Sequence, residues 1–366
     1  MIKRRLVLIV GLILAGCVGQ FPLGTLGRVG LAAVPERLSD REFWKLSGDL
    51  SEPAGDFPFD NLISNEVLYQ FVIPDLTGFA RTRRAYIGVG PEQNFTYIST
   101  LKPRIAFVID IRRGNLNLHL LYKALFELSA DRPEFVSRLF SRPRPRGLVP
   151  GSSVDQIFEA FSQVEPSEEL YQTNLKTVTN RLVTTHGFPL SADDLKEIDF
   201  IYRAFSQYGP RIRYSSTGAR GARWPTYIDL MTAQDDMGET HSYLASTEAF
   251  AFVKDLETRN LLVPIVGNFA GPKAIRAVGQ YLKANGTVVS AFYVSNVEQF
   301  LRQDGILDEF CANVATLPID ESSMFIRTTH HKAYQKGFGY GGRKTGFSSD
   351  VATMTTEVKQ CAQQDR

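Results

Sequence analysis

The sequence of 366 residues has almost no net charge, and none of its hydrophobic runs is long. Its 41 Lys and Arg residues nearly balance 39 Asp and Glu residues, and no basic stripe interleaved with aromatic residues occurs, so nucleic acid is not expected as a partner. The sequence also lacks the G-x-S-x-G, H-E-x-x-H and C-x-x-C motifs, which leaves a hydrolase or metal site without a motif. The hydrophobic content of 43% is ordinary for a globular protein and predicts one large domain, with or without an insertion.

The longest early apolar run, residues 6–14, is too short to span a bilayer and follows three basic residues. It leads into the sequence L-A-G-C, which ends at Cys17 and matches the bacterial lipobox. We therefore predict a lipoprotein signal peptide at residues 1–16 and a lipid on Cys17. The alternative is a signal anchor or a plain secretory peptide. Val18, rather than aspartate, follows the cysteine, which predicts a lipid-anchored protein of the cell envelope, at the outer membrane if the cell has one.

Cysteine is scarce, and only Cys311 and Cys361 remain beyond the lipobox. An even pair in an oxidising compartment can form a disulfide. Two unrelated thiols are the alternative, because the sequence does not show whether the two Cα atoms come close.

Residues 85–110 predict a β-strand, a glycine turn, a helix and a second strand. Residues 85–89 and 105–109 are short apolar strands, residues 91–101 suit a helix, and Gly88 and Gly90 mark the turn. Asp110 ends the second strand, 20 residues after Gly90. A Rossmann-type unit places its ribose-binding carboxylate at about this distance.

The match to a dinucleotide-binding motif is partial, because Gln93 stands where the third glycine would be. Glu92 puts a negative charge near the place of a pyrophosphate, so NAD and FAD fit poorly and a nucleoside without phosphates fits better. The candidate cofactor residues are Gly88, Gly90, Glu92 and Asp110.

A second strand, helix and strand follow at residues 261–266, 272–284 and 288–294, and imply a parallel crossover in the same sheet. Because ligands bind at the carboxyl ends of such strands, we expect polar residues there, with a polar cluster before the first strand, to line a ligand site. These candidates are Asn65, Glu66, Asn268, Ser295 and Asn296; for Asn65 and Glu66, helix capping and loop hydrogen bonds are the favoured alternative.

The rest of the chain is predicted to be helical or irregular. A tether covers residues 17–38, a helix begins near Ser64, helices fill residues 151–208, and a Gly-rich polar tail covers residues 328–366. The segment around Asp235 and His241 is the densest titratable cluster, and its spacing indicates a surface turn rather than a metal site. His186 is expected to have a loop role.

Several strings resemble a family of uncharacterised bacterial proteins similar in fold to class I S-adenosylmethionine-dependent methyltransferases. They include GVGPEQNFTY, VIDIRRGN, LYKALFELSADRPEF and VPIVGNFAGPKAIRAVGQYL. The resemblance implies a Rossmann-like α/β domain over about residues 39–327, with helices on both faces of a mostly parallel sheet and a helical insertion at about residues 112–208. It also implies that S-adenosylmethionine is the possible cofactor and that Asn268 corresponds to a substrate-contacting residue.

Two functions follow from these features. The first is an envelope protein that keeps the fold and binds a nucleoside-like or other small polar ligand. The alternative is an active S-adenosylmethionine-dependent methyltransferase. Export favours the first, since the methyl donor is made and kept in the cytoplasm. Ile87 also favours it, because methyltransferases usually carry an acid just before the first glycine.

Overall fold

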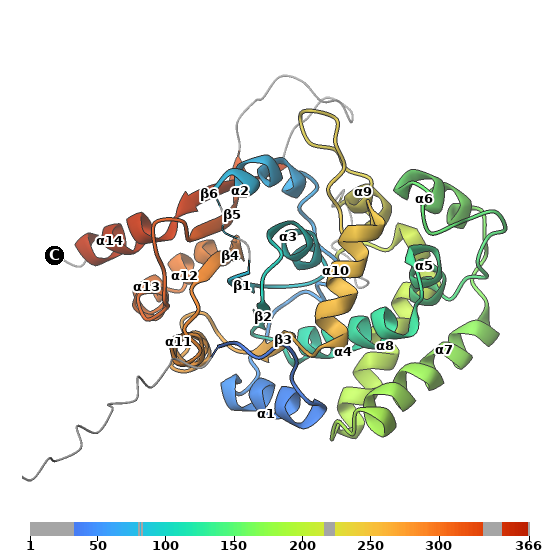
Figure 1. The fold of residues 1–366 in the computed structure, drawn as a ribbon, viewed down its shortest axis with the longest axis horizontal. Coiled ribbons are helices and arrows are strands. Elements are labelled where there is room, and N and C mark those ends of the chain that lie inside the picture. The colour runs from blue at the N-terminus through green and yellow to red at the C-terminus, as the bar shows by residue number, and fades with distance from the viewer. Residues whose placement is uncertain (1–32, 80, 82, 216–223, 332–345, 365–366) are drawn as a thin grey trace, which may run out of the picture. The chain divides into compact units, whose positions relative to one another are not determined.

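A six-stranded sheet lies at the centre of the structure, a computed structural model that describes residues 33–79, 81, 83–215, 224–331 and 346–364 (Figure 1). The strand order is β3-β2-β1-β4-β5-β6, which is typical of Rossmann folds. Neighbouring strands are parallel except for β5 and β6. The predicted α/β fold with a mostly parallel sheet is therefore confirmed. The strands are β1 Ala85–Gly88, β2 Ile105–Asp110, β3 Leu262–Val266, β4 Val289–Ser295, β5 Met324–His331 and β6 Gly346–Thr353.

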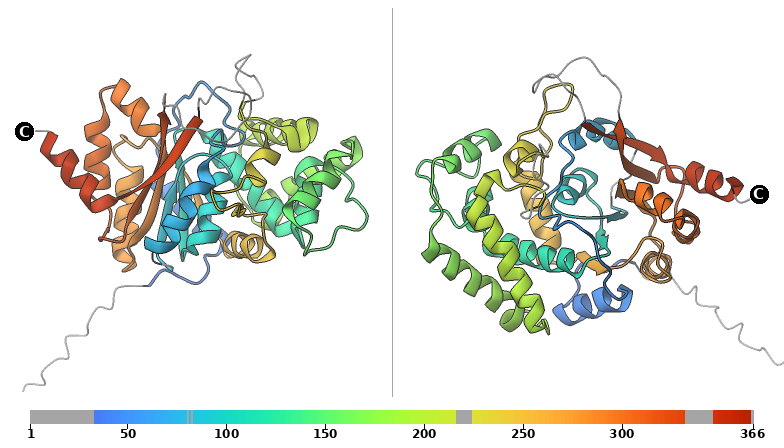
Figure 2. Two further views of the ribbon diagram at one scale, coloured as in Figure 1. Left: turned by 90° about the horizontal axis from the view of Figure 1, so that it is seen from above. Right: turned by 180° about the vertical axis from the view of Figure 1, so that it is seen from behind.

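The central strands are buried along their whole length because helices cover both faces of the sheet. Every residue of β1, β2 and β3 is buried, which explains their continuous apolar sequences. Helices α3 (Gln93–Leu101), α4 (Arg113–Leu128) and α10 (Thr247–Thr258) cover one face. Helices α11 (Ala274–Ala284), α12 (Val297–Gln303) and α13 (Leu307–Val314) lie on the other face (Figure 2), and α1 (Asp40–Leu50) packs on the edge strand β3.

This division follows from the strand order. Right-handed connections lead from β1 through α3 to β2 and onward to β3, so their helices share one face. The chain then returns across the sheet to β4 on the other side of β1, and α11 packs on the opposite face. The reversal between β1 and β4 is the point where such sheets bind ligands at their carboxyl ends.

A long helical segment separates β2 from β3 and packs against α4. Serine caps begin several of these helices; Ser153 and Ser191 each form a capping box. Helices α5 and α8 contact α4 directly, and α7 contacts α8. The elements are α5 Arg132–Phe140, α6 Val154–Ser162, α7 Glu168–Asn180, the π-turn η2 Arg181–Thr185, α8 Ala192–Tyr208, the 3₁₀ turn η3 Gly209–Arg211 and α9 Tyr227–Met231.

Two sequence expectations need correction. The helix expected from Ser64 begins later, as the 3₁₀ turn η1 (Tyr69–Val72) and helix α2 (Ile73–Phe79), because the Ser64 amide donates to Glu92 instead of starting a helix. The segment expected to be a polar tail contains the end of β5, strand β6 and helix α14 (Met354–Gln364). Cys17 and the rest of the predicted signal peptide lie outside the described residues. Within the described residues, no helix is both long and apolar enough to cross a membrane.

Candidate functional site

The glycine turn after β1 encloses a side chain of the protein itself. Asn94, in the first turn of α3, donates from Nδ2 to the carbonyl oxygens of Val89 at 2.9 Å and Pro91 at 2.7 Å. A Cβ atom on Gly88 would lie only 1.9 Å from Asn94 Oδ1. Gly90 has a φ of +75°, which favours glycine. The space beside Gly88 is therefore occupied by Asn94, whereas the space beside Gly90 is open.

Asp110, the predicted ribose-binding acid, is paired within the protein. The Arg112 side chain places Nε 3.1 Å from Oδ1 and Nη2 3.1 Å from Oδ2, and the Arg112 amide donates to Oδ1 at 2.9 Å. Arg112 Nη1 also donates to the Asp60 carbonyl oxygen. The carboxylate side chain is 5% exposed and the guanidinium side chain 12%. Both oxygens of Asp110 are thus already engaged by donors.

Glu92 does not present the negative charge that the sequence predicted beside the turn. Its carboxyl group is fully buried, one oxygen accepts from the Ser64 amide at 3.1 Å, and Oε2 has no hydrogen-bond partner among the described residues. Burial raises the pKa of Glu92 to about 8, so the group is mostly protonated at neutral pH.

A buried histidine supports the same turn from α4. His119 Nε2 lies 2.9 Å from the Gly90 carbonyl oxygen, and burial lowers the pKa of His119 to about 4. The neutral ring donates its proton to this carbonyl, so the turn is held from two helices, α3 and α4.

Side chains from the start of α3, the end of β4 and the middle of β5 meet at Glu66, which is 2% exposed. Its Oε1 accepts from Ser295 Oγ, and its Oε2 accepts from Gln93 Nε2 at 2.8 Å and Thr328 Oγ1 at 2.6 Å. Glu66 and Ser295, both predicted as ligand residues, are therefore close together at the β1/β4 reversal, but they bind each other. Asn296 is next to Ser295 and accepts from its hydroxyl at 3.4 Å.

Asn268 is separated from this group by two strands. It follows β3, the edge strand, and β2 and β1 lie between β3 and β4, a distance on the order of 14 Å at the usual strand spacing. Asn268 Oδ1 accepts from the Ala270 amide at 2.9 Å, a contact within its own loop. Asn65 is half-buried beside Glu66. The predicted ligand residues thus do not form a single group.

A different polar group lies at the amino edge of the sheet, and the sequence analysis missed it. His186 Nδ1 is 2.8 Å from Asp40 Oδ1, and His186 Nε2 is 2.7 Å from Glu127 Oε2. These three residues line a cavity of about 440 Å³, here named the amino-edge cavity, whose wall is formed by Arg37, Leu38, Ser39, Asp40, Glu127, Arg181, His186, Lys254, Thr258 and Asn260. Helix α4 starts at the carboxyl end of β2 and runs back along the sheet, and α10 ends just before β3 begins. Both helices therefore end at the amino edge, so the cavity lies at the edge opposite the glycine turn.

The Asp235 segment forms a turn of its own. His241 Nε2 lies 2.7 Å from Asp235 Oδ2, and the amides of Met237 and Glu239 donate to Asp235 Oδ1, each at 2.9 Å. Among the described residues, no group of three or more His, Cys, Asp or Glu side chains is arranged to hold a metal ion.

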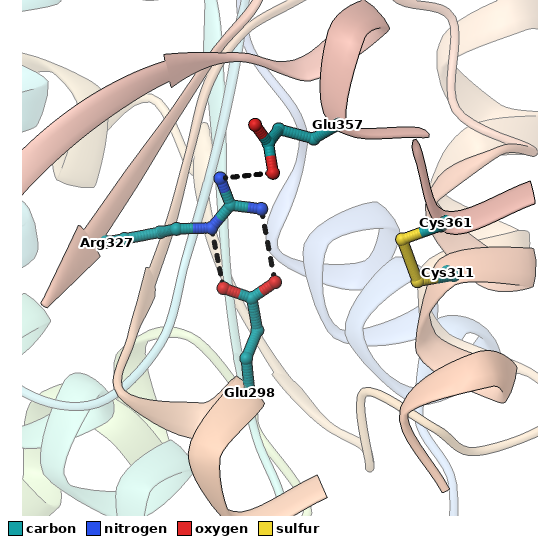
Figure 3. The surroundings of a disulfide bond; sticks show 5 residues. All are labelled: Glu298, Cys311, Arg327, Glu357 and Cys361. Carbon is teal, nitrogen blue, oxygen red and sulfur yellow. Dashed lines mark hydrogen bonds and ion pairs between the residues drawn. A yellow bond between two sulfur atoms is a disulfide. The ribbon is translucent and has the colours of Figure 1, made fainter. Parts of the chain in front are cut away.

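Cys311 and Cys361 are joined by a disulfide that links α13 to α14 across 50 residues (Figure 3). Their Cα atoms are 6.0 Å apart. Beside the disulfide, Arg327 of β5 pairs with Glu298 at 2.6 Å and with Glu357 at 3.1 Å, so α14 is attached to α13 by a covalent bond and to the sheet by an ion pair.

Comparison with known families identifies one match. The model of a family described as a domain of unknown function, DUF7790, matches residues 62–365, which span the sheet, the glycine turn and the disulfide. A comparison with curated proteins found no match.

Proposed function

Because the chain belongs to the DUF7790 family, whose description assigns no chemistry, we propose from its own residues that it is a small-ligand-binding protein of the cell envelope. In this proposal the protein keeps a methyltransferase-like, Rossmann-like fold as a scaffold and does not transfer methyl groups. A lipid on Cys17 attaches it to the membrane.

The observation that carries the proposal is the pairing of Asp110 with Arg112. A ribose would need the carboxylate to accept from its two hydroxyls, but three donors of Arg112 already occupy both oxygens. Displacing a buried guanidinium leaves one charge without a partner, which costs several kcal/mol. Asn94 also occupies the space beside Gly88 in the neighbouring turn. These residues do not fit S-adenosylmethionine.

The envelope location is supported by two separate features. The lipobox ending at Cys17 predicts export and acylation. The disulfide between Cys311 and Cys361 is typical of proteins in oxidising compartments. Both features argue against a protein that depends on a methyl donor from the cytoplasm.

The second candidate is an active S-adenosylmethionine-dependent methyltransferase. The strand order and the reversal between β1 and β4 favour it, since this arrangement forms a nucleotide crevice in many Rossmann folds. Under this proposal Gly88, Gly90 and Asp110 would hold the cofactor, and substrate would enter near Asn268.

Calorimetric titration of the full-length protein with S-adenosylmethionine and S-adenosylhomocysteine tests the two candidates. We expect no binding by the folded wild-type protein. Binding in the micromolar range that is lost in Asp110→Ala would overturn the proposal and establish the methyltransferase candidate.

A further inference from the structure

The centre of the amino-edge cavity is a histidine held between two acids. Asp40 comes from the first turn of α1, Glu127 from the last turn of α4, and His186 directly follows η2. Each carboxylate meets a different ring nitrogen, so the imidazole bridges the two acids. The acids lie on opposite sides of the imidazole, so they cannot converge on one cation.

The two acids are held by buried partners. Lys123 is 1% exposed, and its Nζ lies 2.8 Å from Glu127 Oε1, while the other Glu127 oxygen meets His186. Asn260 Nδ2 donates to Asp40 at 2.8 Å and supports the second acid. The charge of Glu127 is therefore compensated by Lys123, whereas Asp40 is held by its contacts with Asn260 and His186.

Three cations on the cavity wall keep donors that no described residue accepts. Arg37 donates from Nη1 to the Thr258 carbonyl oxygen at 3.2 Å, and Lys254 donates to the Ser129 carbonyl oxygen; both acceptors are neutral. The Nε of Arg181 forms a long ion pair with Glu127 Oε2, at 3.8 Å, and no described residue accepts a hydrogen bond from its terminal nitrogens. Donors of all three residues remain available to a ligand.

We propose that the amino-edge cavity binds a small anion, a molecule that carries a carboxylate or phosphate group. The guanidinium of Arg181 offers the paired donors that match such a group, and Arg37 and Lys254 add positive charge beside it. The volume of about 440 Å³ is within the range of small-molecule pockets. This inference rests on the proposed binding function and adds a place and a ligand class to it.

The test is calorimetric titration of the full-length protein, in a non-ionic detergent, with inorganic phosphate, citrate and glycerol 3-phosphate against sodium chloride of equal ionic strength. We expect at least one of the three anions to bind and chloride not to compete. Arg181→Gln is expected to weaken binding by about tenfold or more, the loss that follows from removing a charged hydrogen-bond donor. Lys254→Gln is a second variant that removes a wall cation in a different helix.

Arg302→Gln is the matched control. Arg302 is exposed on α12, away from the cavity, and its substitution removes the same charge as Arg181→Gln. Circular dichroism verifies that each variant is folded. No binding of any of the three anions up to concentrations on the order of 10 mM would overturn the inference, as would equal losses in Arg181→Gln and Arg302→Gln. These outcomes can be distinguished from those of the S-adenosylmethionine titration, because that titration tests a site at the opposite edge of the sheet.

Discussion

Arg112 lies across the carboxylate of Asp110, with Nε 3.1 Å from one oxygen and Nη2 3.1 Å from the other. The same guanidinium donates to the Asp60 carbonyl oxygen, so it connects the end of β2 to the segment that precedes β1. Asp110, at the position where Rossmann folds carry their ribose-binding acid, therefore helps to hold two parts of the chain together.

A double-mutant cycle tests this role. We expect Arg112→Met to lower the free energy of unfolding by about 3 kcal/mol, because it leaves the buried Asp110 charge without its partner. Asp110→Asn in the same protein removes that charge, so the double variant should lose clearly less than the sum of the two single losses. Urea unfolding of all four proteins measures the cycle. Strictly additive losses would show that the pair is not coupled.

The sequence predicted this edge of the sheet well in outline and poorly in its contacts. The strands, the turn at Gly88 and Gly90 and the position of Asp110 follow from apolar runs and glycine spacing, which are local signals. The sequence did not predict that Arg112 turns back onto Asp110 or that Asn94 lies beside Gly88. Both contacts depend on side-chain orientations, which cannot be inferred from residue spacing.

The amino-edge cavity shows a second limit. Asp40, Glu127 and His186 are far apart in the sequence and each belongs to a different element, so no motif joins them. His186 was expected to have a loop role because the residues around it, THGFPLS, are typical of a turn. Only the packing of α1 and η2 beside α4 brings the three side chains together.

Glu92 predicts how stability depends on pH. Its pKa is about 8 in the folded protein against an ordinary value of 4.5, so between these values the folded state binds more protons than the unfolded state. Stability should therefore fall as pH rises through this range, by up to about 1.4 kcal/mol per pH unit for this group. Glu92→Gln should remove this contribution and become more stable than wild type as pH increases, as measured by urea unfolding from pH 5 to pH 8.

Two further variants complete that experiment. Glu257 is also fully buried with a pKa raised to about 8, so Glu257→Gln should reduce the slope in the same direction. Glu309 is exposed on α13, and Glu309→Gln should leave the slope unchanged. A wild-type slope retained in Glu92→Gln would contradict the assignment of a protonated Glu92.

The disulfide closes a loop of 50 residues, which predicts a large effect on stability. The chain-entropy relation gives a loss of about 4 kcal/mol on its removal. Replacing both Cys311 and Cys361 by Ser avoids leaving a free thiol, and thermal and urea unfolding measure the loss. Reductant should destabilise the wild-type protein to the level of this variant and leave the variant itself unaffected. If the variant matches the oxidised wild type in stability, the bond does not contribute to the fold.

The predicted lipid on Cys17 can be tested by metabolic labelling with an alkyne fatty acid in a bacterial host. We expect label on the wild-type protein and none on Cys17→Ser, because Cys17 of the lipobox is the one residue that we predict to be acylated. Cys361→Ser is the matched control and should keep the label. A single chain of myristoyl length binds membranes only marginally, whereas several acyl chains give a stable anchor. The wild-type protein should therefore stay with the membrane pellet after an alkaline carbonate wash. Wild-type protein without label, or a Cys17→Ser variant that keeps it, would remove the basis for placing this protein on a membrane by its N-terminal lipid.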